Sequence, residues 1–67
     1  MKLEAKIAFV NSQTAAMLAE LEGMKAMNIE RMRNDYALAY GEQAFVDLPV
    51  RFGLSHNQVI DYLRDEP

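Results

Sequence analysis

Apolar side chains in the first half of the chain recur at alternating steps of four and three residues. This spacing keeps them on one side of an α-helix and is typical of the seam that closes a coiled coil. Good helix formers dominate residues 12–46, which contain no proline. The pattern predicts one long helix or two, self-associating through a seam formed by Leu3, Ile7, Val10, Thr14, Met17, Leu21, Met24 and Asn28.

The helical pattern changes in its second half, at Gly23 and beyond. Glycine inside a helix costs about 1 kcal/mol relative to alanine and often stands just past a helix end, so the chain can fold back there. The segment that follows lacks an immediate N-capping Ser, Thr or Asp, which favours an uninterrupted or gently bent helix over a hairpin. Met32, Tyr36 and Tyr40 then advance in steps of four, which rotates the buried face.

A second interpretation competes at the N-terminus, where apolar and polar residues alternate over residues 2–9. This is the period of a half-buried strand, which would have to pair with its copy in a dimer. Strand, helix, turn at Gly23 and helix would then resemble a ribbon-helix-helix repressor. The side chains entering the DNA groove would be Lys2, Glu4 and Lys6, and an acidic one suits phosphate-rich DNA poorly. The heptad seam favours the helix.

The C-terminal third has the residues of two short helices joined by a turn. Its apolar framework comprises Leu48, Phe52, Leu54, Val59 and Tyr62. Gly53 supplies a turn residue that tolerates positive φ. Ser55 can cap the second helix, because its hydroxyl and the side chain of Gln58 can bond each other's backbone N–H groups, as in a capping box. Pro49 requires the first helix to begin near Asp47 and to be short.

Residues 45–64 resemble the helix-turn-helix motif of bacterial and phage repressors. The resemblance implies that the second helix is a recognition helix, whose polar side chains would face base edges in the major groove. These candidate contacts to DNA or another partner are Ser55, His56, Asn57, Gln58 and Asp61. Residues 45–67 carry two arginines against four acidic side chains, however. Because affinity for duplex DNA depends largely on Lys and Arg, the charge disfavours DNA binding.

Length and composition describe one small domain. A chain of 67 residues has a thin core, and the absence of cysteine removes disulfides as a means of stabilising it, which favours a homodimer or higher assembly. We expect a dimerising helix or hairpin over residues 1–44 and a helix-turn-helix-like unit over 45–67. The net charge of −3 is spread along the chain, and no apolar run has the length of a signal peptide or membrane span. We therefore expect a cytoplasmic protein without membrane contact.

Residues suited to chemistry are scarce. His56 is the only histidine, and its neighbour Ser55 points about 100° away on the same helix, so these two cannot form a catalytic pair. No spacing of metal ligands and no cofactor motif is present, so we predict a non-enzymatic protein without cofactor or metal. Methionines crowd one segment, at Met17, Met24, Met27 and Met32; a soft core or dimer seam explains them better than an adaptable binding groove.

These observations favour a small regulatory or adaptor protein that self-associates and binds another protein. In this interpretation the last helix presents Ile60, Tyr62 and Leu63 to a partner or covers the core. The polar Asn28 would fix the register and strand number of the seam. The alternative is a helix-turn-helix DNA-binding transcriptional regulator, which the apolar framework favours and the charge opposes.

Overall fold

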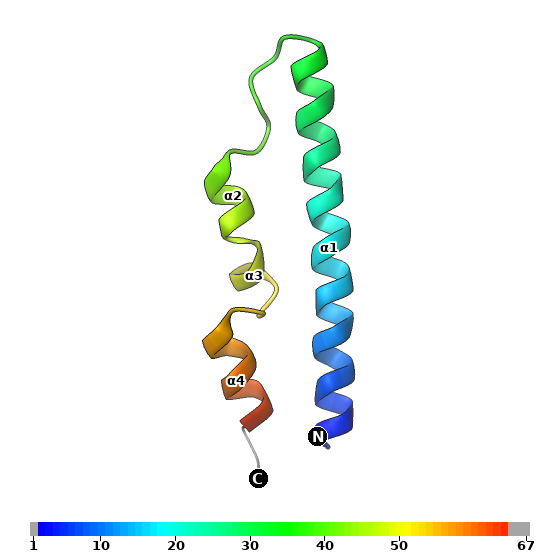
Figure 1. Ribbon diagram of the computed structural model, residues 1–67, viewed down its shortest axis with the longest axis vertical. Helices are drawn as coiled ribbons and strands as arrows, with labels where there is room; N and C mark the ends of the chain where they lie inside the picture. Colours follow the sequence, from blue (N-terminus) through cyan, green and yellow to red (C-terminus); the bar gives the residue numbers. More distant parts are fainter. Residues whose placement is uncertain (1, 65–67) are drawn as a thin grey trace.

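The computed structural model describes residues 2–64, and over this range the chain is all-helical, without a strand. A long helix, α1 (Leu3–Arg33), is followed by α2 (Glu42–Val46), α3 (Leu48–Arg51) and α4 (His56–Arg64). The short helices run back along α1, so the start of α1 and the end of α4 lie at the same end of the molecule (Figure 1). The predicted all-α fold, with a long N-terminal helix before short helices, is confirmed.

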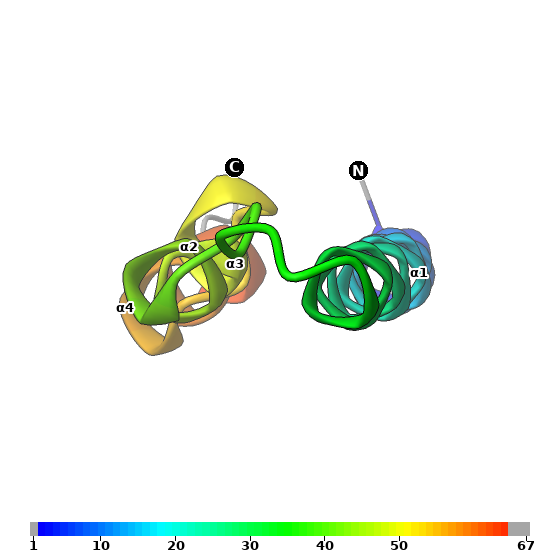
Figure 2. The same ribbon diagram turned by 90° about the horizontal axis from the view of Figure 1, so that it is seen from above.

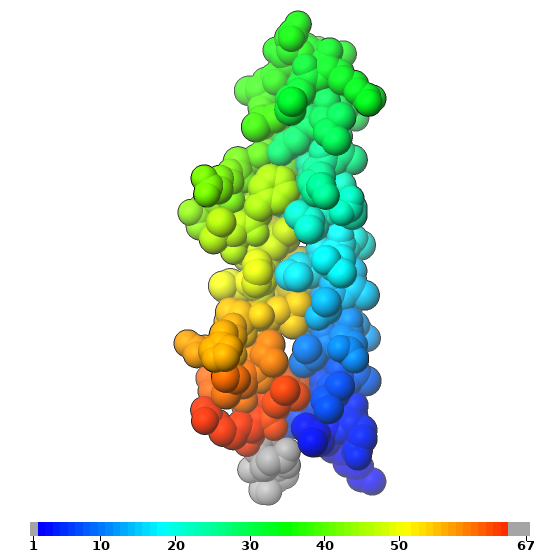
Figure 3. Space-filling view, viewed as in Figure 1, coloured from blue at the N-terminus to red at the C-terminus, as the bar shows by residue number. Residues whose placement is uncertain are grey.

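The molecule consists of two columns side by side, one formed by α1 and the other by the three short helices. Seen along α1, the three short helices overlap in one column beside it (Figure 2). The space-filling view shows the two columns meeting along most of their length (Figure 3). The Cα trace measures 53 × 18 × 10 Å, so this is an elongated, thin molecule with little interior.

α1 is one continuous helix of 31 residues. It passes through Gly23 without a break, which confirms the uninterrupted helix over the hairpin. The strand interpretation of residues 2–9 is wrong, because the helix begins at Leu3, and the ribbon-helix-helix arrangement falls with it. A helix satisfies its own backbone groups: the N–H of Lys6 donates to the carbonyl of Lys2 at 3.0 Å. A lone strand would leave such groups unpaired.

The end of α1 differs from the prediction. The helix stops at Arg33, so the expected continuation through residues 34–41 is wrong. Asp35 adopts a left-handed conformation with φ 59°, and the N–H of Tyr36 donates to the carbonyl of Arg31 at 2.8 Å. This is the Schellman ending of a helix, built here on an aspartate, which tolerates the left-handed region better than most residues. Tyr36 therefore leaves the helix face on which the steps of four had placed it.

Asn28 holds the returning chain against α1. Its side-chain Nδ2 donates to the carbonyl of Tyr40 at 2.8 Å, and its Oδ1 accepts from the N–H of Tyr40 at 3.0 Å. The side-chain amide of Asn28 thus bonds both the N–H and the carbonyl of Tyr40, which lies in the connection between α1 and α2. Within one chain, this polar position fixes where the second column begins its contact with α1.

The core between the columns is small. Among the described apolar residues, Met24 of α1 and Leu48 of α3 are buried, at 1% and 3% exposure. Met17 is partly covered, whereas Met27 and Met32 are exposed. The soft-core interpretation of the methionines therefore fits Met24 and Met17, whereas Met27 and Met32 lie at the surface. A core of this size leaves most apolar side chains at the surface.

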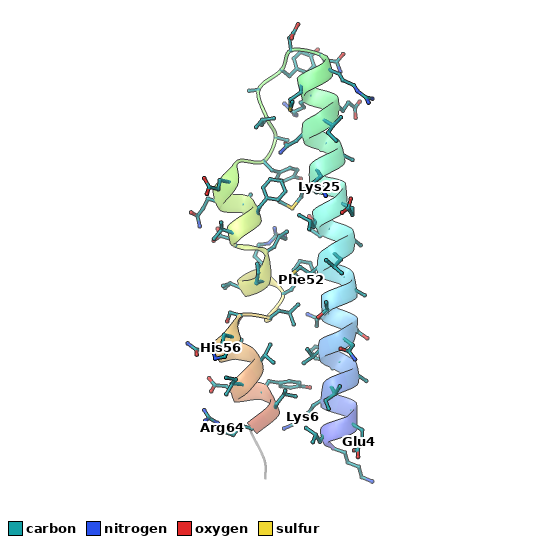
Figure 4. The ribbon with its side chains drawn as sticks, in the orientation of Figure 1. Glu4, Lys6, Lys25, Phe52, His56 and Arg64 are labelled. Carbon is teal, nitrogen blue, oxygen red and sulfur yellow. The ribbon has the colours of Figure 1, made fainter. Side chains whose placement is uncertain are left out.

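The other end of the contact is polar and aromatic. Lys6 is 4% exposed, and its Nζ lies 5.5 Å from the centre of the Tyr62 ring, where an ammonium is attracted by the π-electrons. The rings of Phe9 and Tyr62 meet at 5.7 Å and 55°. Between them and the core, the side chain of Gln13 donates to the carbonyl of Phe52 at 3.1 Å. Figure 4 shows Lys6 reaching from α1 toward α4.

The predicted dimer seam lies partly inside the single chain. Met24 is buried, and partial cover extends to Val10, Met17, Leu21 and Asn28, whereas Leu3 and Ile7 are 50% and 45% exposed. The periodicity thus identifies a face that packs, and in this structure the short helices of the same chain pack on much of it. Self-association through the seam stays a prediction.

Candidate functional site

The turn between α3 and α4 has the predicted geometry. Gly53 has φ 71°, in the left-handed region that glycine adopts without strain. The N–H of Gly53 donates to the carbonyl of Val50 at 3.1 Å, and that of Leu54 to the carbonyl of Pro49 at 2.7 Å, which closes α3. Pro49 lies in the first turn of α3, whose N-cap is Asp47, as its missing N–H requires. The placement of the short first helix and of the turn is confirmed.

A reciprocal capping box begins α4. The N–H of Ser55 donates to Oε1 of Gln58 at 3.1 Å, and the N–H of Gln58 donates to Oγ of Ser55 at 3.4 Å. The Gln58 amide also donates to the carbonyl of Val50 at 3.4 Å, which ties α4 to α3. Two of the five candidate contact residues therefore hold the local fold together, as their spacing predicted.

Truncating the cap should weaken α4 without affecting α1. We expect Ser55→Ala to lower the free energy of unfolding by about 0.5–2 kcal/mol, because the N–H of Gln58 loses its acceptor. Ser55→Asn, which keeps a capping oxygen, serves as the matched control and should stay close to wild type. Urea unfolding followed by circular dichroism measures both. Equal stability of the alanine and asparagine variants would mean that the cap contributes nothing.

The three other candidate contact residues, His56, Asn57 and Asp61, are exposed. His56 and Arg64 lie on the side of α4 away from α1 (Figure 4). Asp61 accepts from Arg64 at 3.1 Å, with both side chains about three quarters exposed, a contact that contributes little to stability. The imidazole of His56 and the amide of Asn57 are therefore exposed to solvent in the first turn of α4. The positive charge of this helix, on Arg64, is paired with Asp61.

The opposite side of α4 packs inward. The Tyr62 ring packs at a tilt against that of Phe9, and Leu63 is partly covered, so neither is presented to a partner in the way that the sequence suggested. Ile60 is 38% exposed and remains accessible. Tyr62 and Leu63 therefore cover the core, which is one of the two roles considered for the last helix.

An exposed line of apolar side chains follows α1. These five residues are each 45–62% exposed, and we call them the outer stripe: Leu3, Ile7, Leu18, Ile29 and Met32. At 100° per residue, they lie within about 80° of one another and about a quarter turn from the face that carries Met24. Only Leu3 and Ile7 belonged to the predicted seam. The missed signal is the spacing of eleven residues between Ile7, Leu18 and Ile29, which also keeps side chains on one side of a helix.

A second exposed region surrounds the end of α1. A hollow of about 500 Å³ is lined by Met27, Glu30, Arg31, Asn34 and Tyr36. Met27 is 44% exposed and Tyr36 65%, so this hollow combines a flexible thioether and an aromatic ring with charged and amide groups. The thioether of methionine is flexible and is common at surfaces that accommodate different partners.

Within residues 2–64 no three His, Asp or Glu side chains gather in a way that could hold a metal ion. None of the described helices has the length and apolarity needed to cross a membrane. In comparisons with known proteins, no family model, no curated protein and no solved structure matches the chain.

Proposed function

We propose that this chain is a small, non-enzymatic regulatory or adaptor protein that self-associates and binds another protein. The observation that carries the proposal is the imbalance between core and surface. Two apolar side chains are buried in the described range, whereas twelve large ones are at least 38% exposed. Each square ångström of apolar surface removed from water stabilises an assembly by about 25 cal/mol, so covering these side chains favours association.

The surfaces available for the two kinds of contact are separate. The outer stripe is long and straight, as a second helix requires, whereas the hollow beside Met27 and Tyr36 is local and lies at one end of the molecule. We assign self-association to the stripe and binding of a different protein to the hollow. The chain contains no cysteine that would need an oxidising compartment, which agrees with a cytoplasmic location.

Partner binding is tested by comparing surface variants of equal stability. We expect Tyr36→Ser to lose an interacting protein that the native chain captures from its host, and Val50→Ser, at a 59% exposed position on α3, to retain it. Binding of the purified partner, titrated against both variants, gives the size of the effect. Removal of one aromatic anchor should weaken binding about tenfold or more. Equal affinity of both variants would remove the hollow from the proposal.

A second candidate function, a helix-turn-helix DNA-binding regulator, is supported by the turn at Gly53, the capping box and the exposed His56 and Asn57. The charge opposes it. In the described part of the C-terminal unit, Arg51 and Arg64 stand against Asp47 and Asp61, so there is no excess of positive charge to neutralise phosphates.

We therefore expect no specific duplex DNA binding at physiological salt. Selection from random duplexes, followed by titration at two ionic strengths, provides the measurement. A defined site bound at submicromolar affinity and weakened by Asn57→Ala, in a protein that remains folded, would make DNA binding the primary function. In that case the side chains in the first turn of α4 would be the site.

A further inference from the structure

The apolar residues of the outer stripe are spaced almost symmetrically about Leu18. Ile7 and Ile29 each stand eleven residues from Leu18, and the ends of the stripe are Leu3 and Met32, fifteen and fourteen residues away. When two identical helices lie antiparallel, residues at equal distances on either side of the twofold axis face each other. An axis at Leu18 would therefore bring Leu18 to its own copy and Ile7 to Ile29, with Leu3 and Met32 one residue out of register at the two ends.

The charges beside the stripe favour the same arrangement. Glu4 lies fourteen residues before Leu18 and Arg33 fifteen residues after it, and both side chains are exposed near this side of α1. No ion pair to either is found among the described residues. An antiparallel pair brings Glu4 of one copy to Arg33 of the other, twice per dimer. A parallel pair would place Glu4 opposite Glu4 and Arg33 opposite Arg33, which repels.

Lys25, the charged residue within the stripe, supports this choice. It lies seven residues after Leu18, so that its counterpart in an antiparallel pair is the neutral Asn11. In a parallel pair two lysines would meet. Lys25 already bonds Glu22 on its own helix, at 3.3 Å between Nζ and Oε1, which turns its charge toward the edge of the stripe.

We propose that a second copy of this chain docks on the outer stripe, with the two α1 helices antiparallel and Leu18 at the twofold axis. The inference rests on the proposed self-association and names its surface and direction. Ile7 then packs against Ile29 of the second copy, and the axis, perpendicular to α1, leaves both columns of short helices on the same side of the α1 pair. The product is a two-layer arrangement of four columns, the two α1 helices in one layer and the two columns of short helices in the other, with closed symmetry.

The contact area sets the strength of this dimer. A helix of 31 residues is about 46 Å long, and a contact strip about 10 Å wide then buries roughly 900 Å² in total. This lies just below the roughly 1,000 Å² that a specific interface usually exceeds, before any contact between the two columns of short helices is added. We expect a dimer that dissociates in the micromolar range.

Single cysteines test the arrangement, because the chain has none of its own. Ile7→Cys and Ile29→Cys variants are mixed and oxidised, and light scattering of the native chain is recorded from about 5 to 500 µM. We expect disulfides between the two different variants to exceed those within either variant severalfold, since only the mixed pair meets the Cα separation of about 4.4–6.8 Å. Ala16→Cys, exposed on the opposite side of α1, is the control and should not cross-link.

The possible failures are distinguishable. Cross-links of Ile7→Cys with itself would show a parallel pair and overturn the direction. A dimer mass without cross-links in any stripe variant would leave self-association standing and overturn the stripe as its surface. A monomer mass at all concentrations would overturn both.

Charge reversal supplies an independent check. Glu4→Arg should raise the dissociation constant about two- to tenfold, and adding Arg33→Glu should restore it, because the ion pair is re-formed with its signs exchanged. Loss of affinity in the double variant equal to the sum of the two single losses would contradict the proposed contact.

Discussion

Replacing Met24 by aspartate is expected to unfold the two-column structure. Met24 is 1% exposed and is one of two buried apolar residues in the described chain. Losing a buried methionine costs about 2–5 kcal/mol, and leaving a carboxylate there without a partner adds to this. Because a domain of this size has only about 3–5 kcal/mol of stability from its core, the variant should lose its cooperative thermal transition.

Met27→Asp is the matched control for this experiment. It introduces the same side chain three residues further along the same helix, at a position that is 44% exposed. The expected loss is below about 1 kcal/mol, because an exposed carboxylate remains hydrated. Thermal unfolding by circular dichroism distinguishes the two. If both variants melt like the native chain, the short helices do not pack on α1 through Met24, and the whole predicted seam is free for a second copy.

Two glycines should respond to the same substitution with opposite signs. At both Gly23 and Gly53, a Cβ would meet no atom within 4 Å, so steric contact does not decide the outcome. Gly53 has φ 71°, and Gly53→Ala should lower the free energy of unfolding by about 1–2 kcal/mol through backbone strain. Gly53→Val should lower it further, because a β-branched side chain tolerates this region least.

Gly23→Ala should instead raise the stability by about 0.5–1 kcal/mol, because alanine loses less backbone entropy in a helix interior. Denaturant unfolding of the two alanine variants measures both effects in one protein. A loss of stability at Gly23 would indicate that the chain is not helical there. No loss at Gly53 would mean that the turn between α3 and α4 lies elsewhere.

The α3–α4 unit was predictable because its determinants are local. Gly53, Ser55 and Gln58 lie within six residues of one another. The hydrogen bonds between Ser55 and Gln58 depend on short-range geometry, which the residue types and their spacing predict. The exposure of Asn57 follows from helix geometry, because at about 100° per residue it stands on the side of α4 away from Val59, Tyr62 and Leu63. His56 shares a side of α4 with Ile60, which is itself 38% exposed.

The end of α1 was not predicted, because its signal is weak. A Schellman ending usually carries glycine, and here Asn34 and Asp35 take the last positions without glycine or proline nearby. Both residues tolerate the left-handed region, so this pair was the available indication. The interruption of the steps of four between Met32 and Tyr36 is explained by this ending and not by a stutter.

The partner of the seam could not be predicted from periodicity at all. The spacing of Val10, Met17 and Met24 predicts that one side of α1 is covered, but it does not identify the segment that covers it. Whether a copy or the same chain does so depends on residues 34–41 reversing direction, and on the amide of Asn28 meeting the backbone of Tyr40. That contact joins residues twelve apart through a loop with no regular structure, which no periodic pattern encodes.

The linker at residues 34–41 is the only covalent connection between the two columns, and it lies at the end of the molecule remote from the start of α1 and the end of α4 (Figure 1). While it is intact, the columns meet at an effective concentration of about a millimolar. After a protease cuts an exposed loop of this kind, the two columns are separate peptides, and folding requires their bimolecular association. With so small a core to hold them, the fragments would dissociate at micromolar concentration, so that one cut would be enough to unfold the protein.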